Sequence, residues 1–232
     1  MSDFAREWKI FEETVQAAKK TAQKWVDEKE EMLKQGLCAF CGVKMPFFGR
    51  SCKACYRLKK KKGSLRQSKP CVAHAGTFLV TLAGRSWRIL SAVDDKVLLL
   101  SEKVVGKRPI DSGLGVEWEY CSLRSYLNGE FFDSLGELKP RVIPTDVIDK
   151  TVKLSEKVFL LDKYDAQHYF NYEETNDAFG AGEDWWLKPR GQDKLFYERF
   201  VTADGYLYGN STIYFQEIQF SSGVRPAVWV RL

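Results

Sequence analysis

The chain has 232 residues, of which 44% are hydrophobic and 14% aromatic, so its composition is that of a globular protein with a buried core. No run approaches the roughly 18 to 20 apolar residues that span a bilayer, and the first residues lack the apolar block of a signal peptide. We therefore expect a cytoplasmic protein without a membrane partner, in which the six cysteines are metal ligands or buried side chains rather than a disulfide scaffold.

The formal net charge of +5 is unevenly distributed along the chain. Residues 1–35 carry seven basic and eight acidic side chains, residues 36–76 carry ten basic and no acidic ones, and residues 77–232 carry 19 basic and 23 acidic ones. Charge and composition together predict the following parts: a helix at 1–35, a four-cysteine element at 36–58, a basic linker at 59–76 and a domain at 77–232.

Residues 3–35 are predicted to form one amphipathic helix that ends at Gly36, a suitable C-cap residue. The apolar side chains follow alternating steps of four and three residues, interrupted only at Lys29; they are Phe4, Trp8, Phe11, Val15, Ala18, Ala22, Trp25 and Met32. Such a narrow stripe has two interpretations. The helix packs on its own C-terminal domain, or residues 3–35 form a homo-oligomer through a short coiled coil.

The segment that follows contains the pattern Cys38-x2-Cys41, ten residues, then Cys52-x2-Cys55. Four thiolates in two such pairs can surround Zn²⁺ tetrahedrally, and no strand of apolar residues precedes either pair, as a redox motif would require. Because all four ligands come from the protein, we expect one structural zinc ion per chain rather than a catalytic one.

The same stretch, "CAFCG", "KMPFFGR" and "CKACYRLKKKKG", resembles the treble-clef zinc element of zinc-binding bacterial ribosomal small-subunit proteins. Its basic side chains could neutralise phosphates, which would make it a nucleic-acid-binding module; they are Arg50, Lys53, Arg57, Lys59, Lys60, Lys61 and Lys62. The alternative is a structural or protein-docking element whose lysines form a solvated end.

Residues 77–232 show the pattern of an α+β domain with a twisted antiparallel sheet and two helices. A meander of strands is predicted in residues 77–105, and a helix in 115–132 that places Val116, Tyr120, Leu123, Leu127 and Phe131 on one face. Further predicted elements are a strand at 157–162, a short helix at 163–172, and strands at 184–189, 198–202 and 223–232.

Four ordered motifs in this domain are "SWRIL", "WEYCSLRSYLNGEFF", "VFLLD" followed by "YF", and "WWLKP" with "GVRPAVWVRL". Together they resemble a bacterial domain family of unknown function, found in Gram-positive and gut bacteria and their phages, with a C-type-lectin-like fold. Two departures are Tyr126 and Lys188, where that family usually has Trp and Arg. The resemblance covers nearly all of residues 77–232 and implies a fold and a bacterial or phage origin, but no activity.

The motif residues themselves are interpreted physically. Arg124 and Arg225 are expected to make buried, charge-assisted hydrogen bonds that tie loops to the sheet. The large aromatic side chains of the motifs are expected in the core; they are Trp87, Trp118, Trp185, Trp186 and Trp229.

Support for catalysis is weak. His74 and His168 have no nucleophile or metal partner at a suitable spacing, and Cys121 on the predicted helix is expected to be a packed thiol. We therefore expect a protein without enzymatic activity.

A binding surface for a protein or other ligand is predicted in residues 190–222, which are rich in Tyr, Phe, Asn, Ser and Gly. The residues selected for it are Tyr197, Tyr206, Tyr208, Asn210, Tyr214 and Phe215. Lectin-like domains of diversity-generating retroelements place their variable ligand-binding residues in this part of the chain, which gives a second, more specific form of the same hypothesis.

Overall fold

The computed structural model describes residues 3–37, 44, 72–75, 77–110, 118–149, 152–170, 182–188, 199–201, 207–208 and 221–232. The helical elements are α1 (Asp3–Lys34), α3 (Val72–Ala75), the 3-10 helix η1 (Trp118–Tyr120), α4 (Ser122–Tyr126), the π-helix η2 (Leu127–Phe131), the 3-10 helix η3 (Gly136–Arg141) and α5 (Lys163–Tyr169). None of the helices in these ranges is long and apolar enough to cross a membrane.

The described strands form two five-stranded sheets and one hairpin, which makes the chain an α+β protein. The first sheet is antiparallel and contains, in spatial order, β1 (Leu79–Leu82), β2 (Arg85–Val93), β3 (Lys96–Ser101), β12 (Ala227–Arg231) and β5 (Val142–Ile143). The second contains β10 (Leu207–Tyr208), β9 (Arg199–Val201), β8 (Trp185–Leu187), β11 (Ser221–Gly223) and β4 (Lys107–Pro109), with β8 and β11 parallel. The hairpin pairs β6 (Thr145–Asp149) with β7 (Val152–Glu156).

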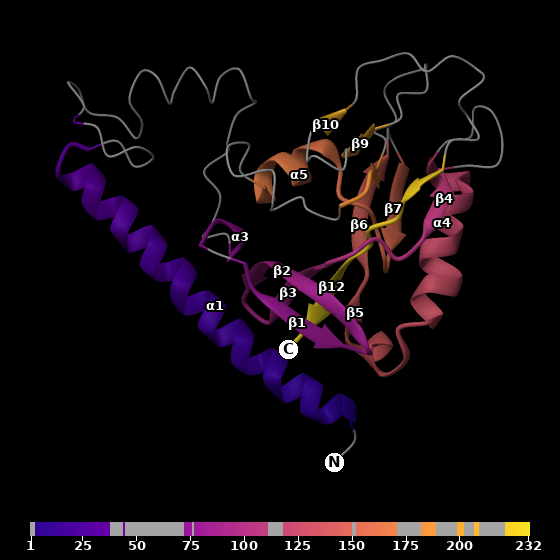
Figure 1. Cartoon of the computed structure of the whole chain (residues 1–232), viewed down its shortest axis with the longest axis horizontal. Helices are drawn as coiled ribbons and strands as arrows, with labels where there is room; N and C mark the ends of the chain where they lie inside the picture. Colours follow the sequence, from indigo (N-terminus) through magenta and orange to yellow (C-terminus); the bar gives the residue numbers. More distant parts are fainter. Residues whose placement is uncertain are drawn as a thin grey trace.

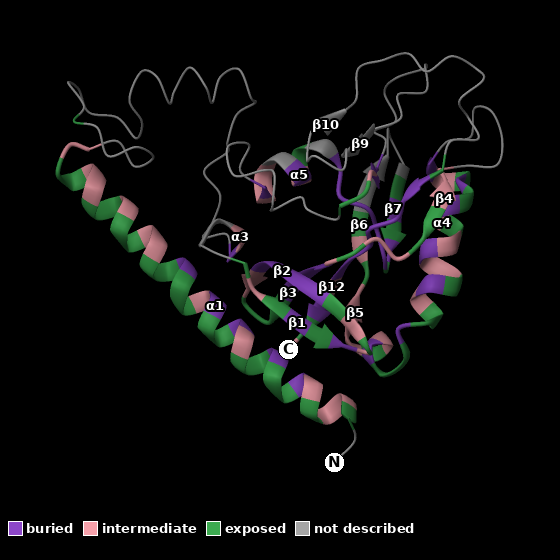
Figure 2. Cartoon of the chain, viewed as in Figure 1, coloured by how far each residue is buried: buried purple, intermediate pink, exposed green. Residues whose placement is uncertain are grey.

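The helix predicted for residues 3–35 is confirmed as α1, which lies along the first sheet (Figure 1). The predicted apolar stripe is the side that it buries, as Figure 2 shows: Trp8, Phe11, Val15, Ala18 and Ala22 are at most 7% exposed. These side chains share one hydrophobic core with Trp87 and Ile89 of β2. The first interpretation, in which the helix packs on its own chain, therefore holds for this part of α1. A coiled coil with a second chain through the same stripe would require α1 to leave the sheet.

Two polar contacts hold α1 in register with the sheet. The Glu7 carboxylate accepts a hydrogen bond from the Ala83 N–H in the β1–β2 turn, at 2.9 Å. About three turns later, the Lys19 ammonium donates to the Asp94 carbonyl in the β2–β3 turn, at 2.7 Å. The two contacts fix the direction of α1 along β2.

The end of α1 is a Schellman motif centred on Gly36. The Gly36 N–H donates to the Leu33 carbonyl at 3.0 Å, and the Leu37 N–H donates to the Met32 carbonyl at 2.8 Å. Gly36 has a φ of +71°, a conformation that costs glycine little because it has no Cβ. The prediction of Gly36 as the C-cap glycine is confirmed.

The first sheet is buried on both faces. One face contributes Leu82, Ile89 and Leu99 to the core shared with α1 and the η2 region, and the other contributes Leu98 and Leu100 to a core shared with α5 and β8. The near-continuous apolar run in β3 follows from this arrangement, because successive side chains of a strand point to opposite faces. All four tryptophans at positions 87, 118, 185 and 186 are at most 3% exposed, whereas Trp229 is half-buried.

Two predictions for the middle of the chain were wrong. The helix predicted for 115–132 is divided, in its described part, into η1, α4 and η2, and Tyr120 is 69% exposed instead of buried on its face. The strand predicted for 157–162 makes only a single bridge, between Phe159 and Ala227. The pairing occurs just before it, in the β6–β7 hairpin, where the sequence reasoning placed no strand.

Candidate functional site

Three strands of the second sheet each have one terminus at the same end of that sheet. Leu187 at the end of β8 pairs with Arg199 at the start of β9, and Tyr208 at the end of β10 pairs with the next residue of β9, Phe200. Leu187, Arg199 and Tyr208 therefore lie at one end of the second sheet, which we call the loop end.

The loop end stands on a buried platform. Trp185 and Leu187 are fully buried in one cluster with Leu161, Ala166 and Phe170 from the α5 region. The backbone of Lys188 donates to the Leu161 carbonyl at 2.9 Å, which joins the end of β8 to the residue before the α5 cap.

The helix beside the loop end is short but firmly capped. Asp162 accepts hydrogen bonds from the backbone of Tyr164 and Asp165, at 2.7 and 2.9 Å, and the Asp165 carboxylate accepts from the Asp162 N–H in return. This capping box satisfies N–H groups that have no partner inside a helix. A rigid support of this kind is what binding loops require, because precision is lost when loops rest on mobile elements.

Arg225 of the "GVRPA" motif is a buried cation at the junction of the two sheets. Its guanidinium is fully buried, donates to the Ser101 carbonyl at 2.7 Å and lies 3.7 Å from the Glu102 carboxylate. Glu102 also accepts two hydrogen bonds from Arg88, at 2.7 and 2.8 Å. Burial lowers the pKa of Arg225 to about 10, which leaves the side chain charged at neutral pH. The prediction that Arg225 ties a loop to the sheet is confirmed.

The glycine of the same motif is required by a close approach of two segments. Gly223 donates to the Asp184 carbonyl at 2.8 Å. A Cβ added to Gly223 would lie 2.6 Å from that oxygen and 2.6 Å from a methyl group of Val104. Only glycine fits here without a shift of the backbone.

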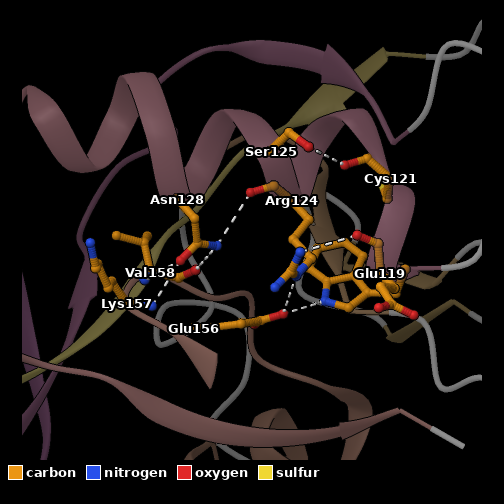
Figure 3. A network of polar contacts seen from close by, with 9 residues as sticks. Glu119, Cys121, Arg124, Ser125, Asn128, Glu156, Lys157 and Val158 are labelled. Carbon is orange, nitrogen blue, oxygen red and sulfur yellow. Dashed lines mark hydrogen bonds and ion pairs between the residues drawn. The ribbon is translucent and has the colours of Figure 1, made fainter. Parts of the chain in front are cut away.

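A buried carboxylate, Glu156, organises the "WEYCSLRSYLN" motif (Figure 3). Its side chain is fully buried, and its Oε1 accepts hydrogen bonds from the Trp118 indole at 2.6 Å and from the Arg124 guanidinium at 3.0 Å. Arg124 also donates to the Glu119 carbonyl at 3.1 Å. The other oxygen, Oε2, is buried without a hydrogen-bond partner among the described residues. The predicted structural role of Arg124 is confirmed.

The asparagine of that motif, Asn128, connects η2 to the two residues that follow Glu156 (Figure 3). Asn128 accepts hydrogen bonds from the backbone of Lys157 and Val158, at 2.8 and 3.3 Å, and donates to the Val158 carbonyl at 3.0 Å. It lies in η2, a π-helical turn, and such turns are costly and often serve to place one side chain. The motif residues Trp118, Arg124 and Asn128 thus all hold residues 156–158.

The predicted functional residues lie almost entirely outside the described ranges. This applies to the four cysteines, to the seven basic residues from Arg50 to Lys62, and to Tyr197, Tyr206, Asn210, Tyr214 and Phe215. Of the predicted ligand-binding residues, Tyr208 is described through its backbone, in β10. In the sequence, Tyr197 precedes the first residue of β9, Arg199, by two positions, and Asn210 follows the last residue of β10, Tyr208, by two.

Two described residues flank the first cysteine pair. Leu37 and Lys44 form an antiparallel bridge, so the backbone positions on either side of Cys38 and Cys41 lie next to each other. The remaining candidates have ordinary surroundings: the Cys121 thiol is buried and donates to the Ile110 carbonyl, and the His168 ring meets that of Tyr169 edge-on.

Glu156 and Asn128 were missed by the sequence reasoning. A signal for Glu156 does exist, because β7 alternates between exposed Lys153 and Ser155 and buried Leu154 and Glu156, so the carboxylate occupies an inward position of a strand. A charge at such a position is rarely tolerated unless it has a partner.

Residues 94–232 match the model of a family described as Domain of unknown function (DUF6273), and the chain belongs to this family. The match begins at the β2–β3 turn, so α1, β1 and β2 precede it although they share its core. A search of the curated proteins and a search of the solved structures each gave no match.

Proposed function

We propose that this member of the DUF6273 family is a non-enzymatic binding protein whose C-terminal domain, with a C-type-lectin-like fold, holds a protein or other ligand at the loop end. The observation that supports the proposal best is the convergence of Leu187, Arg199 and Tyr208 on one end of a sheet with a buried platform beneath it. The polar groups of the motifs, Arg124, Asn128 and Arg225, are in contrast engaged in structural contacts within the chain. Function is therefore assigned to the loops rather than to the motifs.

The residues that we assign to ligand contact first are Tyr197 and Asn210, because each is two residues in sequence from a strand end that lies at the loop end, Arg199 or Tyr208. Tyrosine offers rigid aromatic area and a hydroxyl group, and asparagine offers both a donor and an acceptor. The double substitution Tyr197→Ser with Asn210→Ala is expected to abolish binding, while Tyr120→Ser, which removes an exposed tyrosine on η1, leaves it unchanged.

The experiment uses the immobilised full chain and both variants, exposed to one cell extract, with retained proteins and glycans identified by mass spectrometry and nucleic acids by sequencing. A protein or glycan retained by the wild type and by Tyr120→Ser, but lost with the double substitution, supports the proposal. Equal retention by all three contradicts it. Nucleic acid that is released by moderate salt, and is lost when Lys59 to Lys62 become Gln, would instead favour the alternative function of the basic segment.

We also propose that Cys38, Cys41, Cys52 and Cys55 hold one structural zinc ion. The antiparallel bridge between Leu37 and Lys44 supports this, since it brings the backbone before Cys38 close to the backbone after Cys41, as a metal ion bound by both cysteines would require. Within the described part of the chain, no group of three or more His, Cys, Asp or Glu residues could hold a metal ion, so the proposal rests on the cysteines.

Elemental analysis of the purified full chain is expected to give about one zinc per chain. The double substitution Cys41→Ser with Cys52→Ser should release the metal, because one ligand is removed from each pair. Cys71→Ser serves as the matched control and should retain it. A zinc content that survives the double substitution would show that the ligand assignment is wrong.

A further inference from the structure

One edge of the first sheet is formed by β1 and the other by β5. Among the described residues, β1 pairs with β2 alone. The Ile89 N–H donates to the Phe78 carbonyl at 2.9 Å, and hydrogen-bonded pairs alternate along an antiparallel ladder. The backbone groups of Val80 and Leu82 therefore face β2, and those of Leu79 and Thr81 face outward. Within the described ranges, neither Leu79 nor Thr81 has a backbone hydrogen bond outside the β1–β2 pair.

This edge lacks the features that normally protect an edge strand from pairing. Its sequence, Leu79-Val80-Thr81-Leu82, contains no charge and no proline, and Leu79 is 48% exposed. The other described edges of the two sheets are different: β4 carries Lys107, Arg108 and Pro109, and β5 and β10 are only two residues long. Proteins use lysine and proline on edge strands to prevent association, so the unprotected edge of β1 indicates a docking surface.

A matching surface runs along the flank of α1 that lies next to β1. Glu7 reaches the β1–β2 turn at Ala83, and steps of three and four residues from Glu7 lead to a line of uncharged side chains on the same side of the helix. They are Ile10, Thr14, Ala17 and Thr21, of which Ile10 is 51% exposed. Lys19 lies on the other flank, where it contacts the β2–β3 turn. Trp8, at the border of the buried stripe with that flank, contacts Arg141.

We propose that β1 and this flank of α1 form a two-fold interface with a second copy of the chain. In the register that satisfies the open backbone groups, Val80 lies opposite Val80 of the second copy, and Leu79 exchanges hydrogen bonds with the second copy's Thr81. The two sheets then form one continuous sheet, at the usual strand spacing of about 4.8 Å. The α1 helices, each lying above its own β1 and β2, come side by side through Ile10.

A second copy is the occupant because the surface is complementary to itself. A two-fold axis through Val80 brings like residues together, which is unfavourable for a charged surface but not for one whose central residues are Leu, Val, Thr, Ile and Ala. The one charged residue named on this flank, Glu7, lies at its end and already accepts the hydrogen bond from Ala83. The interface would involve about ten residues from each copy, fewer than the roughly 20 to 30 of a standard interface. We therefore expect a dissociation constant in the micromolar range and a dimer that depends on concentration.

The test is sedimentation velocity of the full chain between about 1 and about 200 µM, a range that brackets a micromolar dissociation constant. The mass should rise from the monomer value of 26.7 kDa toward twice that value. Leu79→Lys and, independently, Ile10→Glu should each keep the chain monomeric, and Tyr164→Lys, at an exposed site on α5, should still dimerise. All three replaced side chains are exposed, and thermal unfolding confirms that the variants are folded.

Amide hydrogen exchange gives a second readout of the same interface. The N–H groups of Leu79 and Thr81 should exchange at least about tenfold more slowly at the high concentration than at the low one, because each is hydrogen-bonded only in the dimer. A wild type that stays monomeric throughout, or a dimer that is insensitive to both Leu79→Lys and Ile10→Glu, would overturn the proposal. A dimer lost only on substitution of Met32 would also overturn it, since that result would assign self-association to the apolar stripe of α1.

Discussion

Replacing Arg124 by methionine should lower the free energy of unfolding by about 3 to 5 kcal/mol. The Arg124 guanidinium lies 3.0 Å from Oε1 of Glu156, whose side chain is fully buried. Without the arginine, the carboxylate would keep the Trp118 indole as its one partner among the described residues, and its charge in the interior would no longer be balanced by that of Arg124. Chemical denaturation, followed by tryptophan fluorescence, measures the change.

The double substitution Arg124→Met with Glu156→Gln separates the charge effect from the loss of packing. A glutamine can still accept the hydrogen bond from Trp118, so removing both charges should restore roughly half or more of the lost stability, because the cost of the unpaired carboxylate disappears. If the double variant were as unstable as the sum of the two single variants, the pair would contribute through shape alone and our assignment of Glu156 as the organising charge would be wrong.

Phe11→Ala is the second substitution with a large expected effect, a loss of about 3 to 5 kcal/mol in the free energy of unfolding. Phe11 is fully buried between α1 and the first sheet, so its removal leaves a cavity in the core that α1 shares with β2. The matched control is Met32→Ala on the half-buried end of the same stripe, for which we expect well under half of this loss. Thermal and denaturant unfolding of the full chain provide the comparison.

The same pair of variants tests whether α1 belongs to the folded domain. A full-sized effect of Phe11→Ala would show that the independent folding unit begins well before residue 94, where the family match starts. If Phe11→Ala left stability unchanged, α1 would not be packed on the sheet in solution. Truncation at residue 77 is expected to expose the sheet face that α1 covers, so binding experiments require the full chain.

The sequence allowed α1, its C-cap and six of the twelve described strands to be predicted, namely β1, β2, β3, β8, β9 and β12, because these elements follow from local periodicity. The apolar spacing from Trp8 to Ala22 repeats often enough to define a helix, and the positive φ of Gly36 explains why a glycine follows its end. The same pattern could not decide what the stripe packs against, since an apolar seam suits a sheet and a second helix equally well. That decision required the contacts of Glu7 and Lys19 with the turns of the sheet.

The errors arose where tertiary contacts override periodicity. Tyr120 fits the apolar spacing of a continuous helix, but the chain breaks into η1 and α4 so that Trp118 and Arg124 can both reach Glu156. Glu156 itself is 30 or more residues away in sequence, and no local pattern connects the two segments. The zinc ligands and the loop residues stay predictions, because they lie outside the described ranges.

Beyond Ala22, α1 continues as an α-helix to Lys34. The direction in which the chain leaves this helix toward the cysteine-rich segment therefore depends on the number of residues in the helix. From Ala22 to Lys34 the helix rises about 18 Å, at 1.5 Å per residue, and each further residue adds a rotation of about 100° about the helix axis. One residue inserted after Lys24 would therefore swing everything beyond Gly36 through more than a quarter turn about the helix axis. Seven inserted residues would restore the direction to within about 20° and move the segment about 10 Å outward. Natural length variation in this part of α1 should consequently occur in steps of about seven or eleven residues wherever the direction of the segment is important to its partner.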